Sequence, residues 1–284
     1  MKEIFDKKNS DFHSINCGGK LVDLSSPKIM GILNLTPDSF SDGGNFLSEE
    51  NALAHAEKMI KEGAEFLDIG AQSTRPKSKL LSAETEILRF GKIISMIKKE
   101  FPETLISLDT FYSEVARFGF QEGMDIVNDI SGGMFDDKMF KTVAELQIPY
   151  ILMHINPTYN SMHENLISED IILKINYYFS EKIQELRSLH VNDIILDPGF
   201  GFGKTMEQQF QMIEEFQFFS FVKQPVLAGI SRKSFIYKSM GKLPTEISEE
   251  TQKFHLKLLE KGAKILRVHD VAETKKVVDE FINS

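Results

Sequence analysis

The chain has 284 residues, of which 42% are hydrophobic, and a formal net charge of −9. A nucleic-acid-binding protein needs a clustered basic face, so the acidic balance argues against that class. Cys17 is the only cysteine, which excludes an internal disulfide and a thiolate metal cluster. The N-terminal stretch lacks the apolar core of a signal peptide, and no apolar run reaches membrane-spanning length. We therefore expect a cytoplasmic protein with no membrane partner.

Residues 1–27 precede the repeating part of the chain. Within them, residues 14–24 have the pattern of a small β-hairpin that turns at Cys17-Gly18-Gly19. We expect this hairpin to close the bottom of a barrel, and we assign it no catalytic role.

From residue 28 onward, short strand-like runs alternate with segments of helical period, without a break in composition. This alternation predicts a single (β/α)₈ barrel domain over residues 28–284, an α/β fold. The expected strands are Ile29–Asn34, Phe66–Gly70, Leu105–Asp109, Asp125–Asp129, Pro149–Met153, Asp193–Asp197, Pro225–Gly229 and Lys264–Val268.

Helix-start signals and long connections complete this pattern. Ser48 is the expected N-cap of the first helix, and Thr205 with Gln208 has the spacing of a capping box. The connections 35–47 and 71–81 are longer than usual and follow strands. They should lie at the carboxyl end of the barrel, where long loops are usually functional.

Nearly every expected strand finishes on a polar or charged residue. The carboxyl ends of parallel barrel strands meet on one face, so these side chains should converge on one ligand site. The residues are Asn34, Asp68, Asp109, Asn128, Asp129, His154, Asp197, Ser231, Lys233, Arg267 and His269.

Three of these residues suit a heterocycle with donor and acceptor edges. A carboxylate and a carboxamide, Asp109 and Asn128, can accept and donate in one pocket, although each could equally cap a following helix. Asp197 precedes a glycine-rich turn, and its carboxylate could accept two parallel N–H bonds from a 2-amino-4-oxo pyrimidine edge.

Two other patterns are rejected as functional motifs. Gly203-Lys204-Thr205 imitates the end of a phosphate-binding P-loop, but Pro198 stands where that loop requires glycine. His154 and His163 do not have the spacing of metal ligands, so we interpret both as structural.

Six motifs, in chain order over residues 28–271, resemble those of the dihydropteroate synthases. They include N-L-T-P-D-S-F-S-D-G-G from residue 34, S-T-R-P from 73, D-P-G-F-G-F-G-K from 197, S-R-K from 231 and R-V-H-D-V from 267. The sequence departs from the family at Lys77, where glycine is common, and at Asn156-Pro157.

The resemblance implies a role for each matching residue. The implied pterin ligands are Asp109, Asn128, Met153, Asp197 and Lys233. The implied p-aminobenzoate contacts are Phe40, Thr74, Arg75, Pro76, Phe202 and Ser234. Pyrophosphate would be bound by Asn34, Arg75, Arg267 and His269, with Asn34 also a ligand of Mg²⁺. The implied catalytic residues are Asn34, Lys233, Arg267 and His269.

The implied reaction joins 6-hydroxymethyl-7,8-dihydropterin pyrophosphate to p-aminobenzoate, giving 7,8-dihydropteroate for folate biosynthesis. Magnesium pyrophosphate would leave first, and the arylamine would then attack. The resemblance further implies sulfonamide inhibition and a homodimer.

Two other classes compete with this reading. A pterin-dependent methyltransferase would share the barrel and the carboxylates but would lack S-T-R-P together with S-R-K. A non-catalytic pterin-binding homologue should have lost Asn34, Arg267 or His269, and all three are present.

Overall fold

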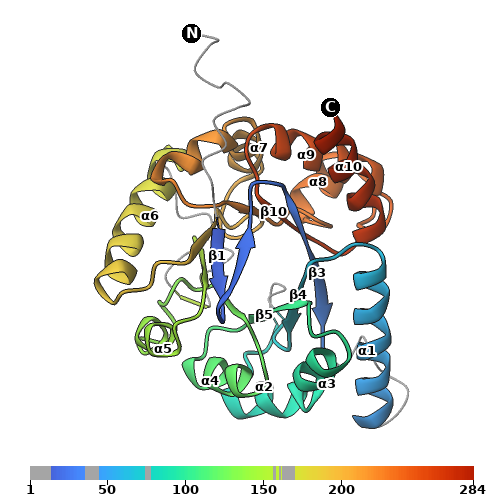
Figure 1. The fold of residues 1–284 in the computed structure, drawn as a ribbon. Coiled ribbons are helices and arrows are strands. Elements are labelled where there is room, and N and C mark those ends of the chain that lie inside the picture. The colour runs from blue at the N-terminus through green and yellow to red at the C-terminus, as the bar shows by residue number, and fades with distance from the viewer. Residues whose placement is uncertain (1–13, 36–44, 74–77, 156–157, 160, 162–169) are drawn as a thin grey trace.

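The computed structural model consists of a barrel of parallel strands ringed by helices, with an antiparallel hairpin across one end (Figure 1). The described residues are 14–35, 45–73, 78–155, 158–159, 161 and 170–284, with the backbone alone described for 45–48. The barrel strands are β3 (Lys28–Asn34), β4 (Phe66–Gly70), β5 (Leu105–Asp109), β6 (Ile126–Asp129), β7 (Tyr150–Met153), β8 (Ile194–Asp197), β9 (Leu227–Ala228) and β10 (Ile265–Val268).

The strand order β8-β7-β6-β5-β4-β3-β10-β9 is that of an eight-stranded barrel. A parallel bridge between Leu196 and Val226 joins the two outer strands and closes the ring. The predicted fold class is confirmed. Strand β9 is shorter than predicted because Pro225 has no N–H to give to the sheet, and only its carbonyl pairs with β8, accepting from Leu196 N at 2.9 Å.

More helices surround the barrel than a strict alternation requires, since two follow β4 and two follow β9. The helices are α1 (Asn45–Lys61), α2 (Ala83–Phe90), α3 (Ile93–Glu100), α4 (Ser113–Gln121), α5 (Met139–Leu146), α6 (Ile171–Ser188), α7 (Met206–Glu214), α8 (Ser234–Ser239), α9 (Ser248–Glu260) and α10 (Val271–Asn283), with the 3₁₀ helix η2 (Phe216–Val222). None of the helices among the described residues is long and apolar enough to cross a membrane.

The two predicted helix starts have different outcomes. The capping box is confirmed, because Thr205 Oγ1 accepts from Gln208 N at 3.2 Å and Gln208 Oε1 accepts from Thr205 N at 2.9 Å. The N-cap predicted at Ser48 is wrong, because α1 begins at Asn45 and Ser48 lies in its first turn.

The amino end of the barrel is filled by an apolar layer. Each of the eight strands contributes one buried side chain, and the hairpin of β1 (Ser14–Cys17) and β2 (Lys20–Asp23) packs against them. The layer consists of Met30, Phe66, Leu105, Ile126, Ile151, Ile195, Leu227 and Ile265, with Ile15, Cys17 and Leu24 from the hairpin segment. The hairpin therefore closes the barrel as predicted, and burial raises the pKa of the Cys17 thiol to about 12.

Two residues further along each strand, the inward positions change character. Side chains two apart on a strand point to the same face, so these positions form the next layer inside the barrel. They are Ile32, Asp68, Ser107, Asn128, Met153, Asp197, Gly229 and Arg267. The strand period itself therefore places three of the five predicted pterin ligands, Asn128, Met153 and Asp197, directly above an apolar floor, together with Arg267.

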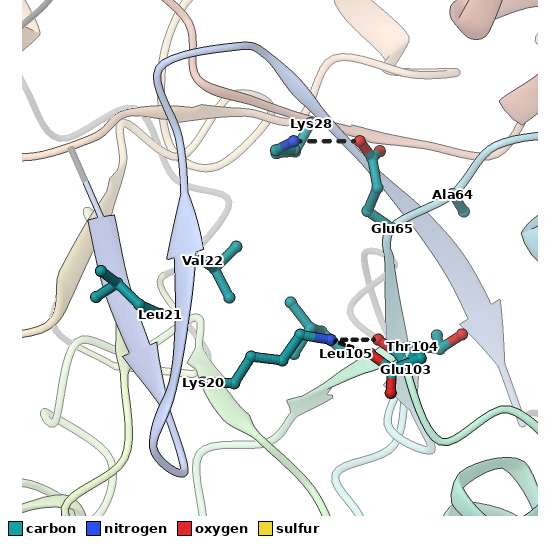
Figure 2. A pocket seen from close by; sticks show the side chains of 9 residues that line it. All are labelled: Lys20, Leu21, Val22, Lys28, Ala64, Glu65, Glu103, Thr104 and Leu105. Carbon is teal, nitrogen blue, oxygen red and sulfur yellow. Dashed lines mark hydrogen bonds and ion pairs between the residues drawn. The ribbon is translucent and has the colours of Figure 1, made fainter. Parts of the chain in front are cut away.

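A hollow of about 320 Å³ lies at the amino end, between the hairpin and the starts of β3, β4 and β5 (Figure 2). Its charged side chains pair with one another, Lys20 with Glu103 at 2.6 Å and Lys28 with Glu65 at 3.6 Å. We assign the hollow no function.

Candidate active site

A second cavity, of about 40 Å³, lies at the carboxyl ends of the strands. It is lined by Asp109, Asn128, Ile130, Met153, Asp197, Phe200, Phe202, Gly229, Lys233 and Arg267. Most of the predicted pterin ligands therefore meet in one place. The cavity is small for a bicyclic ligand, so we expect lining side chains to move when such a ligand binds.

Arg267 is held between two carboxylates in this structure. Its Nε donates to Asp68 Oδ2 at 2.6 Å, and its Nη2 donates to Asp109 Oδ2 at 2.9 Å. Burial opposes the charged guanidinium, but the two carboxylates outweigh burial and raise the pKa of Arg267 further. Arg267 thus neutralises negative charge in the pocket whose carboxylates are expected to bind the pterin.

Asp68 is the functional residue that sequence reasoning left without a role. It is 0% exposed and accepts from Ser107 Oγ at 2.6 Å and Asn128 Nδ2 at 3.0 Å, besides Arg267. The signal was present, because Asp68 is a charged residue inside the otherwise apolar run F-L-D-I-G. A charge in a buried strand is rarely left unpaired, so it indicates a polar network.

The two carboxylates lining the cavity differ in their surroundings. Burial, and then the negative charge of Asp68, raise the pKa of Asp109 to about 7, with Arg267 opposing the shift. Burial also raises the pKa of Asp197, although a hydrogen bond from Gly199 N at 2.7 Å stabilises its charged form. A ligand that donates N–H bonds to either carboxylate would stabilise its ionised form.

The turn after Asp197 is fixed by glycine and by a buried lysine. Gly199 has φ +73°, and a Cβ there would lie 2.1 Å from the carbonyl oxygen of His154. Lys204 Nζ donates to the carbonyls of Gly199 at 2.9 Å and Phe202 at 3.0 Å, and burial lowers its pKa to about 7. Lys204 therefore supports the backbone that positions Asp197, and not a phosphate.

Lys233 closes the cavity from the side of Phe202. Its Nζ lies 4.4 Å from the centroid of the Phe202 ring, a cation–π distance. Burial, followed by the positive charge of Arg267, lowers the pKa of Lys233 to about 8, so it stays protonated at pH 7. Both side chains line the cavity.

His269 lies beside Ser231, at the start of the segment after β10. Ser231 Oγ accepts from His269 N at 3.2 Å, so its own proton is available for His269 Nδ1 at 3.1 Å. In the tautomer that carries its ring proton on Nε2, His269 Nδ1 accepts this hydroxyl proton. Burial, and then the charges of Arg232 and Arg267, lower the pKa of His269 to about 3, so its imidazole is neutral at pH 7.

Asp129 and His154 serve the framework. Asp129 caps the turn after β6, accepting from Ser131 N and Oγ at 2.7 Å and from Gly133 N at 2.9 Å. His154 is buried edge-on against Tyr178, with 5.0 Å between ring centroids, and burial and Lys204 lower its pKa well below the usual value.

Two other predicted residues, Asn34 and Ser234, do not line this cavity. Asn34 is exposed at the end of β3, and Ser234 is exposed at the first position of α8. Outside the described residues lie Phe40, Thr74, Arg75, Pro76, Lys77, Asn156, Pro157 and His163.

The described residues offer few ligands for a magnesium ion. The described ranges contain no group of three His, Cys, Asp or Glu side chains that could hold a metal. Mg²⁺, however, keeps several waters and takes oxygens from bound phosphate, so the single exposed amide oxygen of Asn34 is compatible with an ion that a phosphorylated substrate brings.

Comparisons with known proteins agree with this geometry. Residues 30–269 match the family described as pterin binding enzyme. Dihydropteroate synthase of Haemophilus influenzae is 37% identical over 257 residues, covering 90% of this chain and 93% of its own. The structure of Xanthomonas albilineans dihydropteroate synthase with 4-aminobenzoic acid superposes with a TM-score of 0.89 at 32% identity, covering 96% of this chain and 98% of the other.

A third similar protein has a known structure as a drug complex. Yersinia pestis dihydropteroate synthase, in a sulfonamide drug complex, has a TM-score of 0.87 at 31% identity, covering 95% of this chain and 98% of the other. The match runs through both the apolar floor and the polar layer of the barrel. The chain therefore belongs to the dihydropteroate synthase family of pterin-binding enzymes, which are transferases.

Proposed function

We propose that this enzyme condenses 6-hydroxymethyl-7,8-dihydropterin pyrophosphate with p-aminobenzoate, releasing pyrophosphate and 7,8-dihydropteroate for folate biosynthesis. One observation carries the proposal. Asp109, Asn128 and Asp197 bring hydrogen-bond acceptors to one small cavity, and Lys233 and Arg267 bring cations to the same cavity. This combination suits a heterocycle rich in N–H donors that bears an anionic leaving group.

The pterin would displace contacts that now fill the cavity. Lys233 would leave the ring of Phe202, and the heterocycle would lie between the carboxylates and the side chain of Met153. The carboxylates Asp109 and Asp197 would accept N–H bonds in their ionised forms, which Arg267 and Lys233 favour. Phe202 would then be available to the aminobenzoate ring.

The leaving group would be stabilised by positive charge and N–H donors. Arg267 has five N–H donors, and among the described residues its bonds to Asp68 and Asp109 use only Nε and Nη2. It can therefore donate to a phosphate oxygen without abandoning either carboxylate. His269 can donate from Nε2, and an anion beside it would raise its pKa towards protonation.

The chemistry follows from this charge arrangement. The bond from the pterin methylene to the pyrophosphate oxygen breaks with both electrons on oxygen, and the electron-rich pterin supports the positive charge left on carbon. The aminobenzoate nitrogen then attacks that carbon and loses a proton. Magnesium, held by Asn34 and the pyrophosphate, would add Lewis-acid stabilisation of the departing oxygen.

Three associated expectations are part of the proposal. Sulfonamides should compete with p-aminobenzoate. The sulfonamide drug complex of Y. pestis dihydropteroate synthase supports this expectation. A homodimer is favoured by exposed apolar side chains on the neighbouring elements α6 and η2, namely Leu173, Tyr177, Phe218 and Phe221. We expect a cytoplasmic location on the basis of the sequence alone.

The decisive test is an assay of pyrophosphate release with purified protein and Mg²⁺. We expect release only when both substrates are present, and inhibition by a sulfonamide that added p-aminobenzoate relieves. Release without p-aminobenzoate would indicate a hydrolase, and no release with both substrates would reject the proposal.

A further inference from the structure

We propose that Asp68 is a positioning residue that sets the hydrogen-bonding pattern of the pterin pocket, by holding the Asn128 amide with its carbonyl oxygen towards the ligand. The inference deepens the proposed function and rests on it. It assigns a role to a buried acid that does not line the cavity itself.

Asp68 receives three donors in a place that water does not reach. Ser107 Oγ donates to Oδ1 at 2.6 Å, while Asn128 Nδ2 at 3.0 Å and Arg267 Nε at 2.6 Å both donate to Oδ2. The guanidinium of Arg267 has no acceptor and can only donate to Oδ2, and its positive charge favours the ionised carboxylate. The set of partners is therefore that of an ionised, acceptor-only carboxylate.

The orientation of the Asn128 amide follows from this carboxylate. With Nδ2 on Asp68, the other end of the amide, Oδ1, is buried and has no hydrogen-bond partner among the described residues. The reverse orientation would place Oδ1 against Asp68 Oδ2, two acceptors in contact. Amide orientations are decided by such networks, and here one acceptor-only partner decides it.

An unpartnered buried carbonyl oxygen in the cavity lining favours a ligand that donates a hydrogen bond to it. Leaving it unpaired costs free energy, so a bound molecule that offers an N–H there gains affinity. With Asp109 and Asp197, the Asn128 carbonyl makes a third acceptor in the lining. The pocket so configured selects a ligand with several N–H donors, and Asp68 is the residue that keeps Asn128 in the accepting state.

Asp68 also bears on Arg267, so the experiment must separate two routes. If Asp68 acts through Asn128, its replacement should matter only while Asn128 is present. If it acts only as a counter-ion of Arg267, its replacement should matter in either background. A double-mutant cycle measures this difference directly.

The cycle consists of wild type, Asp68→Asn, Asn128→Ala and the double variant, each titrated with 6-hydroxymethylpterin by calorimetry. Asp68→Asn preserves shape but can donate to Asn128, so the Asn128 amide is expected to flip and present N–H to the ligand's own donors. We expect pterin affinity to fall about tenfold or more. In the Asn128→Ala background the same change should alter affinity less than about twofold.

Ser107→Ala is the matched control. It removes the hydrogen bond from Ser107 Oγ to Asp68 at 2.6 Å and leaves the bonds from Asn128 and Arg267 in place. Its pterin affinity should remain within a few-fold of wild type. A tenfold loss in this control would mean that the pocket responds to any change near Asp68, which contradicts the specific role.

A reversed pair tests the same idea if Asp68→Asn alone does not fold, as judged by circular dichroism and thermal unfolding. Asp68→Asn combined with Asn128→Asp lets the amide at position 68 donate to the carboxylate at 128, which keeps an acceptor facing the ligand. Recovery of pterin affinity supports the inference, and a loss as large as that of Asn128→Ala overturns it.

The outcomes separate this inference from the proposed function. A wild-type protein that binds no pterin overturns the proposed function together with the inference. A wild-type protein that binds pterin, with Asp68→Asn binding equally well or losing affinity equally in both Asn128 backgrounds, overturns the inference alone.

Discussion

The two ends of the barrel are built from the same eight strands but have opposite chemistry. At the amino end, one apolar side chain from each strand and three from the hairpin segment form a dry floor. Two residues further along, the same strands carry Asp68, Asn128, Asp197 and Arg267, joined in part by hydrogen bonds and ion pairs. We therefore expect the floor to contribute stability without ligand recognition, and the polar layer to contribute recognition at a cost in stability.

The largest effect is expected from Arg267→Ala in the polar layer. Removing the guanidinium leaves Asp68 and Asp109 buried without their counter-charge, a change that typically costs about 3–5 kcal/mol. We expect a lower free energy of unfolding in denaturant titrations, weaker pterin binding and loss of turnover. Lys276→Ala, which breaks an exposed ion pair with Glu273 at 2.8 Å, is the control and should change little. Stability equal to wild type would show that the carboxylates do not need Arg267.

A change in the floor should affect stability alone. Phe66 is fully buried in the apolar layer, and Phe66→Ala is expected to cost about 3–5 kcal/mol of unfolding free energy by creating a cavity. Protein that remains folded at low temperature should bind 6-hydroxymethylpterin with nearly unchanged affinity. A tenfold loss of pterin affinity in folded protein would contradict the proposal that the floor does not contribute to ligand recognition.

Asp197→Asn tests whether the carboxylate of Asp197, in the polar layer, binds the pterin. The amide would direct N–H at the donors of the pterin, and an unpaired buried contact of this kind costs about 1–3 kcal/mol. Pterin affinity should fall by that amount with the fold intact, as measured by calorimetry and circular dichroism. Near-normal affinity would remove Asp197 from the ligand set.

The smallest expected effect is a pH dependence at Asp109. Folding raises the pKa of this group from 3.8 to about 7, so between these values the native state binds more protons than the unfolded chain. Its contribution to stability therefore falls as pH rises through that window. Pterin binding, which needs the ionised form as an acceptor, should strengthen by about tenfold from pH 6 to pH 8. Asp109→Asn should flatten both profiles, and an unchanged slope would place the titration elsewhere.

The sequence was sufficient for the barrel and for most of the cavity lining. Asp109, Asn128, Asp197 and Arg267 stand at strand ends, and the strand period brings such residues to one face whatever the loops do. The role of Asp68 could not be read in the same way. Its partners come from β5, β6 and β10, and which side chains meet across a barrel depends on the stagger between strands, which local sequence does not encode.

Details that depend on packing were also beyond sequence reasoning. The contact of Lys233 with Phe202 and the resulting small cavity arise from side chains on separate turns. The start of α1 before Ser48 shows the usual uncertainty of helix ends, where several residues can serve as the cap.

The most direct measurement of the central claim is a crystal structure of this enzyme with a bound dihydropterin. The account predicts the heterocycle at the carboxyl end, with its N–H groups within hydrogen-bonding distance of Asp197 and of Asn128 Oδ1, and with Lys233 moved from the Phe202 ring. Electron density for the pterin in the hollow between the hairpin and the strand starts, with the cavity at the carboxyl end unchanged, would contradict it.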